Sequence, residues 1–265
     1  MFHKKHPETL YRIIGHYFKK QYIILSLEKD NTIVKCEILT EEKYMNIDVL
    51  KKAEKQFLME YPGGFNHPQM VAIGKKHKMK QQEDFAQTSL SKDAFNNPRE
   101  LVSNVSKLVT RSSLISVFEK PKFRDLLKSL GSHGIENLTE ALFELIHGKE
   151  QLGFEQLVYF LQEYKLGKWP LATIIQTYYR SSKDVFVKPT TTKLIIEKLE
   201  LGLLYKPTPT WEFYKNYRKI IQDLKKKVDK SFTTNNPAFC GFLMIALAER
   251  YQLSSTSRRT VRSRL

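Results

Sequence analysis

The side chains best suited to hold an anion occur where one predicted helix ends and the next begins. Tyr178-Tyr179-Arg180 end the first helix, and Lys188-Pro189-Thr190-Thr191-Thr192-Lys193 open the second. A helix start offers free backbone N–H groups and the positive end of the helix dipole, so these hydroxyl and lysine groups could hold a phosphate. Tyr178 and Tyr179 could stack on a base or close the pocket. The plainer alternative is that one threonine caps the helix while Pro189 fixes its entry.

A second cationic group lies in Gly74-Lys75-Lys76-His77-Lys78-Met79-Lys80, which carries four lysines within six residues. The apolar residues before it predict a helix whose far end is cationic. Lysines in a last turn also offset the helix dipole, but one helix does not need four of them. The stretch is therefore predicted to face phosphates. The spacing does not fit a helix-turn-helix recognition unit.

The C-terminal segment 254–265 is rich in serine, threonine and arginine and contains no acidic residue. Arginine forms forked hydrogen bonds to phosphate, so this tail could wrap a nucleic-acid backbone. A solvated terminus without a role is the alternative. The arginines of the tail are Arg258, Arg259, Arg262 and Arg264.

The charge of the whole chain points to a polyanionic partner. There are 44 lysines and arginines against 28 acidic residues, a formal net charge of +16. Nucleic acid is the first candidate and an acidic membrane surface the second. Phosphate contacts position a protein without reading sequence, so base specificity and the choice of DNA or RNA do not follow. Two alternatives stay open: an interaction or regulatory module with an acidic protein partner, and an enzyme acting on a phosphorylated or nucleic-acid substrate around Tyr178, Arg180, Lys188 and Thr191.

No motif assigns a catalytic residue. The sequence has no Gly-x-Ser-x-Gly, Walker loop or dinucleotide fingerprint, and its seven histidines form no His-x-x-x-His pair. We therefore expect no metal and no cofactor, and catalysis is left open. The two cysteines are expected to be buried thiols in a reducing compartment. The basic start has no apolar core with a cleavage site, and the apolar run 239–248 is about half a bilayer span, so a cytoplasmic protein without a membrane span is expected.

The period of the apolar residues predicts a mainly α fold. Segments 22–27 and 32–39 are rich in β-forming residues and predict a small N-terminal β-hairpin. From residue 46 the spacing is helical and the connections are short, which favours an irregular multi-helix bundle. Pairs of helices recur at intervals that resemble solenoid repeats, so a solenoid-like arrangement is the alternative. The expected parts are a hairpin-containing extension (1–45), docked on a helical body (46–253), and a basic flexible tail (254–265).

Several helix boundaries are marked by proline, glycine and asparagine. The first helix should stop at Tyr61-Pro62-Gly63-Gly64, and Asn97 and Asn236 should cap later helices. Residues 134–147 and 149–166 predict an antiparallel pair joined at Gly148. Residues 112–120 and 121–130 predict a pair of helices divided at Pro121. Further helices are expected over 169–180, 190–201, 211–228 and 237–253.

Deletion of residues 254–265 tests the tail. The truncated chain should bind duplex DNA more weakly, because four arginine contacts are lost, and its melting temperature should be nearly unchanged. Titration of a labelled duplex and a thermal melt measure both quantities. Equal affinity of the truncated and the full chain would remove the tail from the binding surface.

Overall fold

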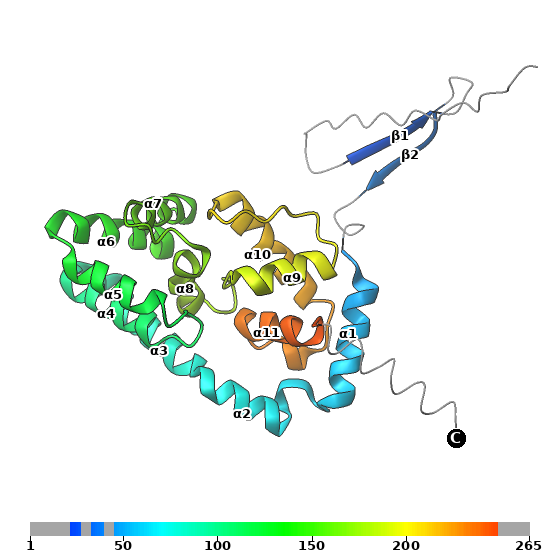
Figure 1. The fold of residues 1–265 in the computed structure, drawn as a ribbon, viewed down its shortest axis with the longest axis horizontal. Helices are drawn as coiled ribbons and strands as arrows, with labels where there is room; N and C mark the ends of the chain where they lie inside the picture. The colour runs from blue at the N-terminus through cyan, green and yellow to red at the C-terminus, as the bar shows by residue number, and fades with distance from the viewer. Residues whose placement is uncertain (1–21, 28–32, 40–44, 249–265) are drawn as a thin grey trace, which may run out of the picture.

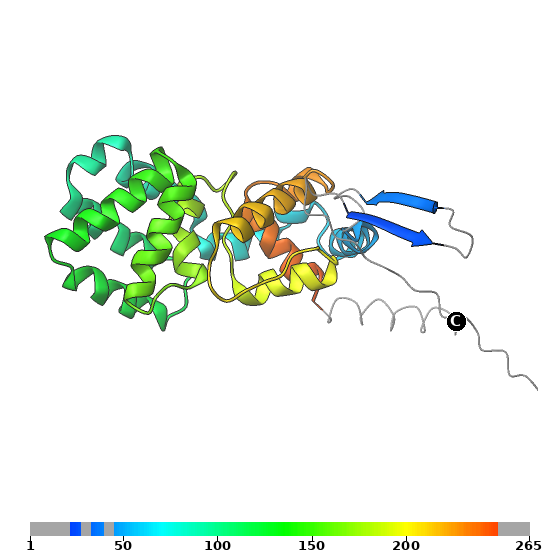
Figure 2. The same cartoon turned by 90° about the horizontal axis from the view of Figure 1, so that it is seen from above.

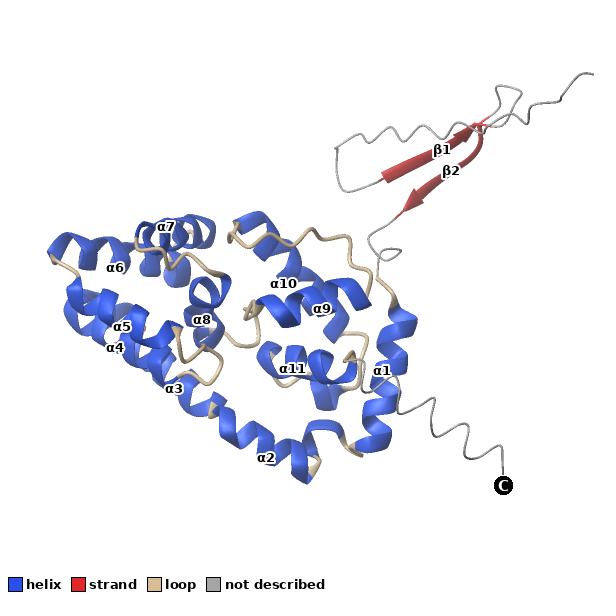
Figure 3. Ribbon diagram, in the orientation of Figure 1, coloured by secondary structure: helices blue, strands red, loops and turns tan. Residues whose placement is uncertain are grey.

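The structure, a computed structural model, describes residues 22–27, 33–39 and 45–248, with side chains described from residue 45 onward. As predicted, the chain is mainly helical, and its helices form a bundle (Figures 1 and 3). The α-helices are α1 (Ile47–Glu60), α2 (Pro68–His77), α3 (Met79–Ser89), α4 (Pro98–Arg111), α5 (Glu119–Ser129), α6 (Ser132–His147), α7 (Glu150–Glu163), α8 (Trp169–Tyr179), α9 (Pro189–Lys198), α10 (Trp211–Lys225) and α11 (Asn236–Ala246). Short 3₁₀ turns are η2 (Gly64–Asn66), η3 (Lys92–Asn96) and η4 (Lys230–Phe232).

Two strands precede the helices. Strand β1 (Tyr22–Leu27) pairs antiparallel with β2 (Ile33–Leu39), with Tyr22 opposite Leu39 and an irregularity after Ser26. The docking of segment 1–45 on the helices stays a prediction, as do the three-part division of the chain and the basic tail, which lies outside the described residues.

The helices form two groups, which we call the first lobe (α3 to α8) and the second lobe (α1 and α9 to α11). Figure 2 shows the lobes side by side, and α2 links them between α1 and α3 (Figure 1). Helix α10 of the second lobe packs against α7 of the first. The chain also crosses between the lobes in residues 180–188, whose Val185 and Val187 are fully buried.

Asparagine caps and apolar stripes set the helices where the sequence predicts them. The Asn97 side chain accepts a hydrogen bond from the backbone N–H of Glu100, and Pro98 occupies the first turn of α4. Because the N–H groups of a first turn have no helical partner, this cap and this proline both favour the start. Helix α1 ends at Glu60, before the proline and glycines. The predicted apolar face of α4 is buried: Leu101, Val105, Leu108 and Val109.

Helices α6 and α7 form the predicted pair joined through Gly148. They pack closely because α7 has glycine at position 153 on the face that meets α6. A Cβ atom at Gly153 would overlap the backbone nitrogen of Leu145 and lie 2.6 Å from the carbonyl oxygen of Ala141. The backbones of the two helices can approach this closely only because this side chain is missing.

Helices α7, α9 and α10 each end three residues before their predicted bounds, and two predicted helix starts are wrong. Residues 112–118 are not helical; α5 begins at Glu119 and contains Pro121 in its first turn, where the missing N–H costs nothing. The cap of α11 is Asn235, whose side chain accepts from the N–H of Ala238. Asn236 is the first helical residue instead, and it is buried.

Aromatic rings fill the second lobe and join it to the first. Phe232 stacks on Phe242 at 4.2 Å between ring centroids, and Phe57 meets both rings edge to face. Between the lobes, Phe154 of α7 stacks on Tyr214 of α10 at 5.1 Å. No helix in the described part of the chain has both the length and the apolar character needed to cross a bilayer.

Gly153→Ala tests the close approach of α6 and α7. The added methyl group meets backbone, which cannot rotate away, so the free energy of unfolding should fall by about 1–3 kcal/mol or more. Gly74→Ala in α2 is the matched control, since a Cβ there meets nothing within 4 Å. It should stabilise by about 0.5–1 kcal/mol. Urea unfolding measures both, and equal stability of Gly153→Ala and the wild type would contradict the close packing.

Candidate functional site

The predicted anion site at the α8–α9 connection does not form as a group of free side chains. Tyr178 is fully buried, and its hydroxyl hydrogen-bonds the Ser112 Oγ at 2.8 Å. Burial raises the pKa of Tyr178 to about 12, although the bond to Ser112 lowers it. This ring therefore cannot stack on a base. Tyr179 is half-buried, with its ring against the His147 ring at 5.5 Å.

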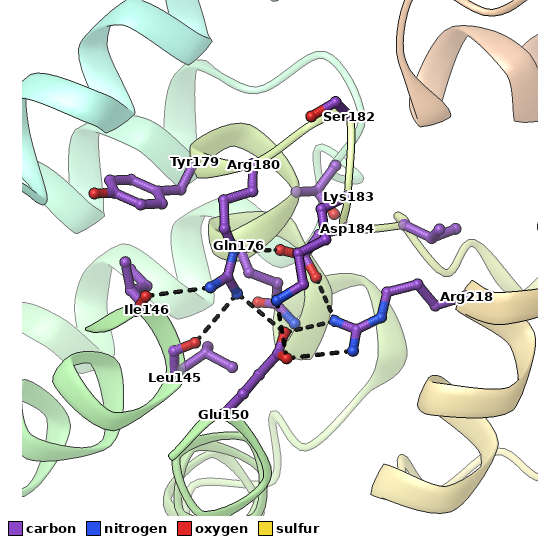
Figure 4. A network of polar contacts seen from close by, with 12 residues as sticks. Leu145, Ile146, Glu150, Gln176, Tyr179, Arg180, Ser182, Lys183, Asp184 and Arg218 are labelled. Atoms are coloured by element: carbon purple, nitrogen blue, oxygen red, sulfur yellow. Dashed lines mark hydrogen bonds and ion pairs between the residues drawn. The ribbon is translucent and has the colours of Figure 1, made fainter. Parts of the chain in front are cut away.

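Arg180 is bound inside the protein rather than presented to solvent. Its Nε donates to Asp184 Oδ2 at 2.6 Å, and its Nη2 donates to Glu150 Oε1 at 3.1 Å (Figure 4). Two further donors reach the carbonyl oxygens of Leu145 and Ile146, each at 3.2 Å. Nearly all the hydrogen-bonding capacity of this guanidinium is used by the C-terminus of α6, the start of α7 and the turn after α8.

Arg218 of α10 completes this ion-pair network, which we define as Glu150, Arg180, Asp184 and Arg218; Asp184 is fully buried and the other three are partly buried. Its Nη1 donates to Glu150 Oε1 at 2.5 Å and to Asp184 Oδ1 at 2.8 Å. The guanidinium also lies over the rings of Trp211 and Tyr214, at 5.5 and 5.2 Å. The Tyr214 hydroxyl donates to Asp184 Oδ1 at 2.9 Å. The network therefore joins the two lobes.

Two carboxylates meet two arginines in this network, and Lys183, half exposed, adds a third cation through its Nζ at 3.2 Å from Glu150 Oε2. Burial alone would raise the pKa of Glu150, but hydrogen bonds and charge from Arg218, with the charge of Arg180, hold it below its usual 4.5. Burial alone would lower the pKa of Arg218, but its bond to Glu150 and the surrounding negative charge raise it. The hydrogen bonds of Arg180 and Arg218 are directed to groups of the protein itself, so the network is structural.

The start of α9 keeps three of its predicted residues at the surface. Lys188, Thr190 and Lys193 are exposed, and the Lys193 Nζ lies 5.1 Å from the centre of the Tyr205 ring. Thr191 is buried, and its hydroxyl donates to the sulfur of Met244. The capping alternative fails as well, because the cap position is Lys188 and no side chain caps the helix.

The lysines at the end of α2 are exposed, and three of them have no carboxylate partner. Within residues 45–248, Lys75, Lys76 and Lys78 form no ion pair, whereas Lys80 pairs with Asp84 at 2.6 Å. No acidic residue occurs between positions 61 and 82. Lys78 adopts the left-handed conformation (φ +50°) that turns α2 directly into α3.

A second basic segment, at the connection between α4 and α5, lies beside the lysines of α2. The His77 Nδ1 of α2 hydrogen-bonds the Ser113 Oγ at 2.9 Å, which brings the connection between α4 and α5 against the end of α2. That connection lies between Arg111, at the end of α4, and two lysines in the first turn of α5. We call the combined set the α2–α5 basic surface: Lys75, Lys76, Lys78, Arg111, Lys120 and Lys122.

The α6–α7 pair has the opposite charge. Between residues 132 and 163 the sequence has six glutamates and one lysine. Four of these glutamates are exposed on α6 and α7, whereas Glu150 is in the network and Glu144 is half-buried and accepts from the Lys149 N–H. In Figure 1 this pair lies at the far edge of the first lobe from α2.

Comparison with protein-family models, with curated proteins and with solved structures finds no match for this chain. The site therefore rests on its own geometry. The sequence did not indicate Glu150 or Arg218, because their partners lie 30 or more residues away. Only the four-residue spacing of Arg180 and Asp184 was visible, and such pairs are common on helix surfaces.

Glu150→Gln tests the ion-pair network. The variant leaves Arg218 and Arg180 partly buried without one of their two carboxylates, so it should lose about 3 kcal/mol of stability at pH 7. Glu155→Gln, on the exposed face of α7, is the control and should change stability by less than about 0.5 kcal/mol.

The loss should depend on pH in a defined direction. Because the folded-state pKa of Glu150 is lowered, its contribution is complete above about pH 4.5 and disappears as pH falls through the folded-state value. Urea unfolding of both proteins from pH 7 to pH 3 measures this. A difference between wild type and Glu150→Gln that stays constant over that range would contradict the ion pairing.

Proposed function

We propose that this chain binds nucleic acid through its phosphates, with the α2–α5 basic surface as the contact. The observation that carries the proposal is the hydrogen bond between His77 and Ser113, because it joins two basic segments that are separate in the sequence. Lys75, Lys76 and Lys78 form no ion pair within residues 45–248, and unpaired cations on two adjoining segments are the pattern of a backbone-contacting surface.

Helix stability does not explain the lysines at the start of α5. Lys120 and Lys122 lie in its first turn, at the positive end of the dipole, where cations are unfavourable. The N–H groups of Glu119 and Lys120 already bond the Ser116 carbonyl and Pro121 has none, so a phosphate there would be attracted by the lysines and the positive end of the helix dipole. The lysines of α2 lie at a C-terminus and are partly explained by the dipole. The α5 lysines are therefore the stronger support.

The structure does not bring together the residues on which the enzyme alternative depended. It required Arg180, Lys188 and a tyrosine around one concave pocket. The polar groups of Tyr178 and Arg180 are instead bound by Ser112 and by the ion-pair network. A shallow hollow of about 350 Å³ lies along α1, lined by Asp48, Val49, Lys51, Lys52 and Lys55, and it contains none of the predicted residues. We propose no catalytic residue.

A charge-matched pair of variants tests the proposal. The triple variant Lys75→Gln, Lys76→Gln, Lys78→Gln should bind duplex DNA more weakly, and the slope of log K against log salt should become less steep by about three. The control triple, Lys52→Gln, Lys168→Gln, Lys215→Gln, removes the same charge from exposed positions on other elements and should leave the slope nearly unchanged. Titrations of a labelled duplex between about 50 and 200 mM salt measure both slopes.

Two results would contradict the proposal. If both triple variants lose affinity equally, the net charge of the protein is responsible and the α2–α5 basic surface is not. If the wild-type affinity barely changes with salt, phosphate contacts do not dominate, and the interaction-module alternative gains support.

A further inference from the structure

An aromatic ring stands exposed beside the α2–α5 basic surface. In the non-helical connection 112–118, Val117 is 70% and Phe118 is 78% exposed. These are among the most exposed large apolar side chains of the described residues, and they are adjacent. Ile115, two residues earlier, is buried and anchors the connection in the first lobe. The pair is too small to be a broad apolar patch, so its neighbouring charges indicate what it could contact.

The backbone beneath this ring is held by hydrogen bonds. The Ser112 Oγ, bonded to the buried Tyr178, also accepts from the N–H of Leu114 at 3.0 Å. The Ser116 Oγ accepts from the N–H of Phe118 at 3.3 Å, and the Ser116 carbonyl accepts from the N–H of Glu119 at 3.0 Å. The connection thus fixes the position from which the ring projects, which lowers the entropic cost of binding.

Cations lie on both sides of the ring in the sequence, with Glu119 between Phe118 and the first lysine. Arg111 precedes the connection and Lys120 and Lys122 follow it, while the bond from Ser113 to His77 brings the end of α2 alongside. A flat ring among phosphate-binding side chains is the arrangement on which proteins stack unpaired bases. In a duplex the bases are already stacked on each other, so an exposed side chain finds a free base face only in a single strand.

We propose that Phe118 stacks on a base of single-stranded nucleic acid while the α2–α5 basic surface binds the flanking phosphates. This inference rests on the proposed function and narrows its substrate class to single strands. Every base has a flat face, so the stacking adds affinity without sequence preference. Val117 contacts the same nucleotide beside the ring.

An anionic membrane is the other partner that lysines beside exposed apolar residues could meet. Membrane-surface segments present a broad continuous apolar face. The exposed Val71 and Ile73 of α2 are two residues apart and therefore point about 200° apart around the helix. The apolar group at the basic surface is thus two side chains wide, which suits one base better than a bilayer.

Phe118→Ala tests the stacking. The variant should bind a mixed-sequence single-stranded oligonucleotide roughly tenfold more weakly. Its affinity for a duplex of the same length should change less than about twofold, and the salt dependence of both should stay the same, because no charge is removed. Phe118→Trp should restore single-strand binding, since it keeps a flat ring. Tyr159→Ala, an aromatic residue of α7 that is 66% exposed, is the control and should change neither affinity.

The outcomes separate the two proposals. Wild-type-like binding of single strands by Phe118→Ala, together with weakened binding by the α2 triple variant, overturns the stacking and leaves the proposed function intact. Equal loss of single-strand and duplex affinity in Phe118→Ala also overturns it. No salt-dependent binding of either nucleic acid by the wild type overturns both proposals. Phe118-dependent binding to vesicles with anionic lipid, with nucleic-acid binding unchanged, assigns the ring to a membrane and overturns the stacking.

Discussion

The buried carboxylate of Asp184 is the constraint on which the junction of the two lobes depends. A charge removed from water this completely is tolerated only when it is paired and hydrogen-bonded. Arg180, from the end of α8, and Arg218, from α10, supply the positive charge, and Tyr214 supplies a further donor. The turn after α8 and the face of α10 are therefore fixed relative to each other. Glu150 extends the same pairing to α7.

This pairing also directs the chain between the lobes. The carbonyl of Asp184 accepts from the Asn236 side chain, and the backbone of Ser181 accepts from the N–H of Asn236, so α11 is attached at the same point. Val185 and Val187 then run buried toward α9. The first lobe, fixed in this way, carries the connection 112–118, whose Ser112 bonds Tyr178, two residues before Arg180. The connection that carries Phe118 is therefore held by α8, the helix that ends next to the ion-pair network.

The sequence predicted the helices well and the site poorly, for the same physical reason. Apolar periodicity and asparagine caps act within a few residues, so α1, α4 and the α6–α7 pair could be read from local sequence. A cation in a sequence, by contrast, is either solvated or paired, and the choice depends on residues far along the chain. Arg180 proved to be paired inside, whereas Lys75 and Lys76 are exposed. The connection 112–118 was mistaken for a helix because Pro121 terminates a helix as readily as it begins one.

The acidic α6–α7 pair lies at the edge of the first lobe that is far from the basic end of α2 (Figure 1). Such a separation of charge gives the protein an electric dipole moment. In the field of a polyanion the molecule experiences a torque that turns α2 toward the partner and α6–α7 away from it before contact. Encounters would then begin largely preoriented, so fewer collisions would be unproductive.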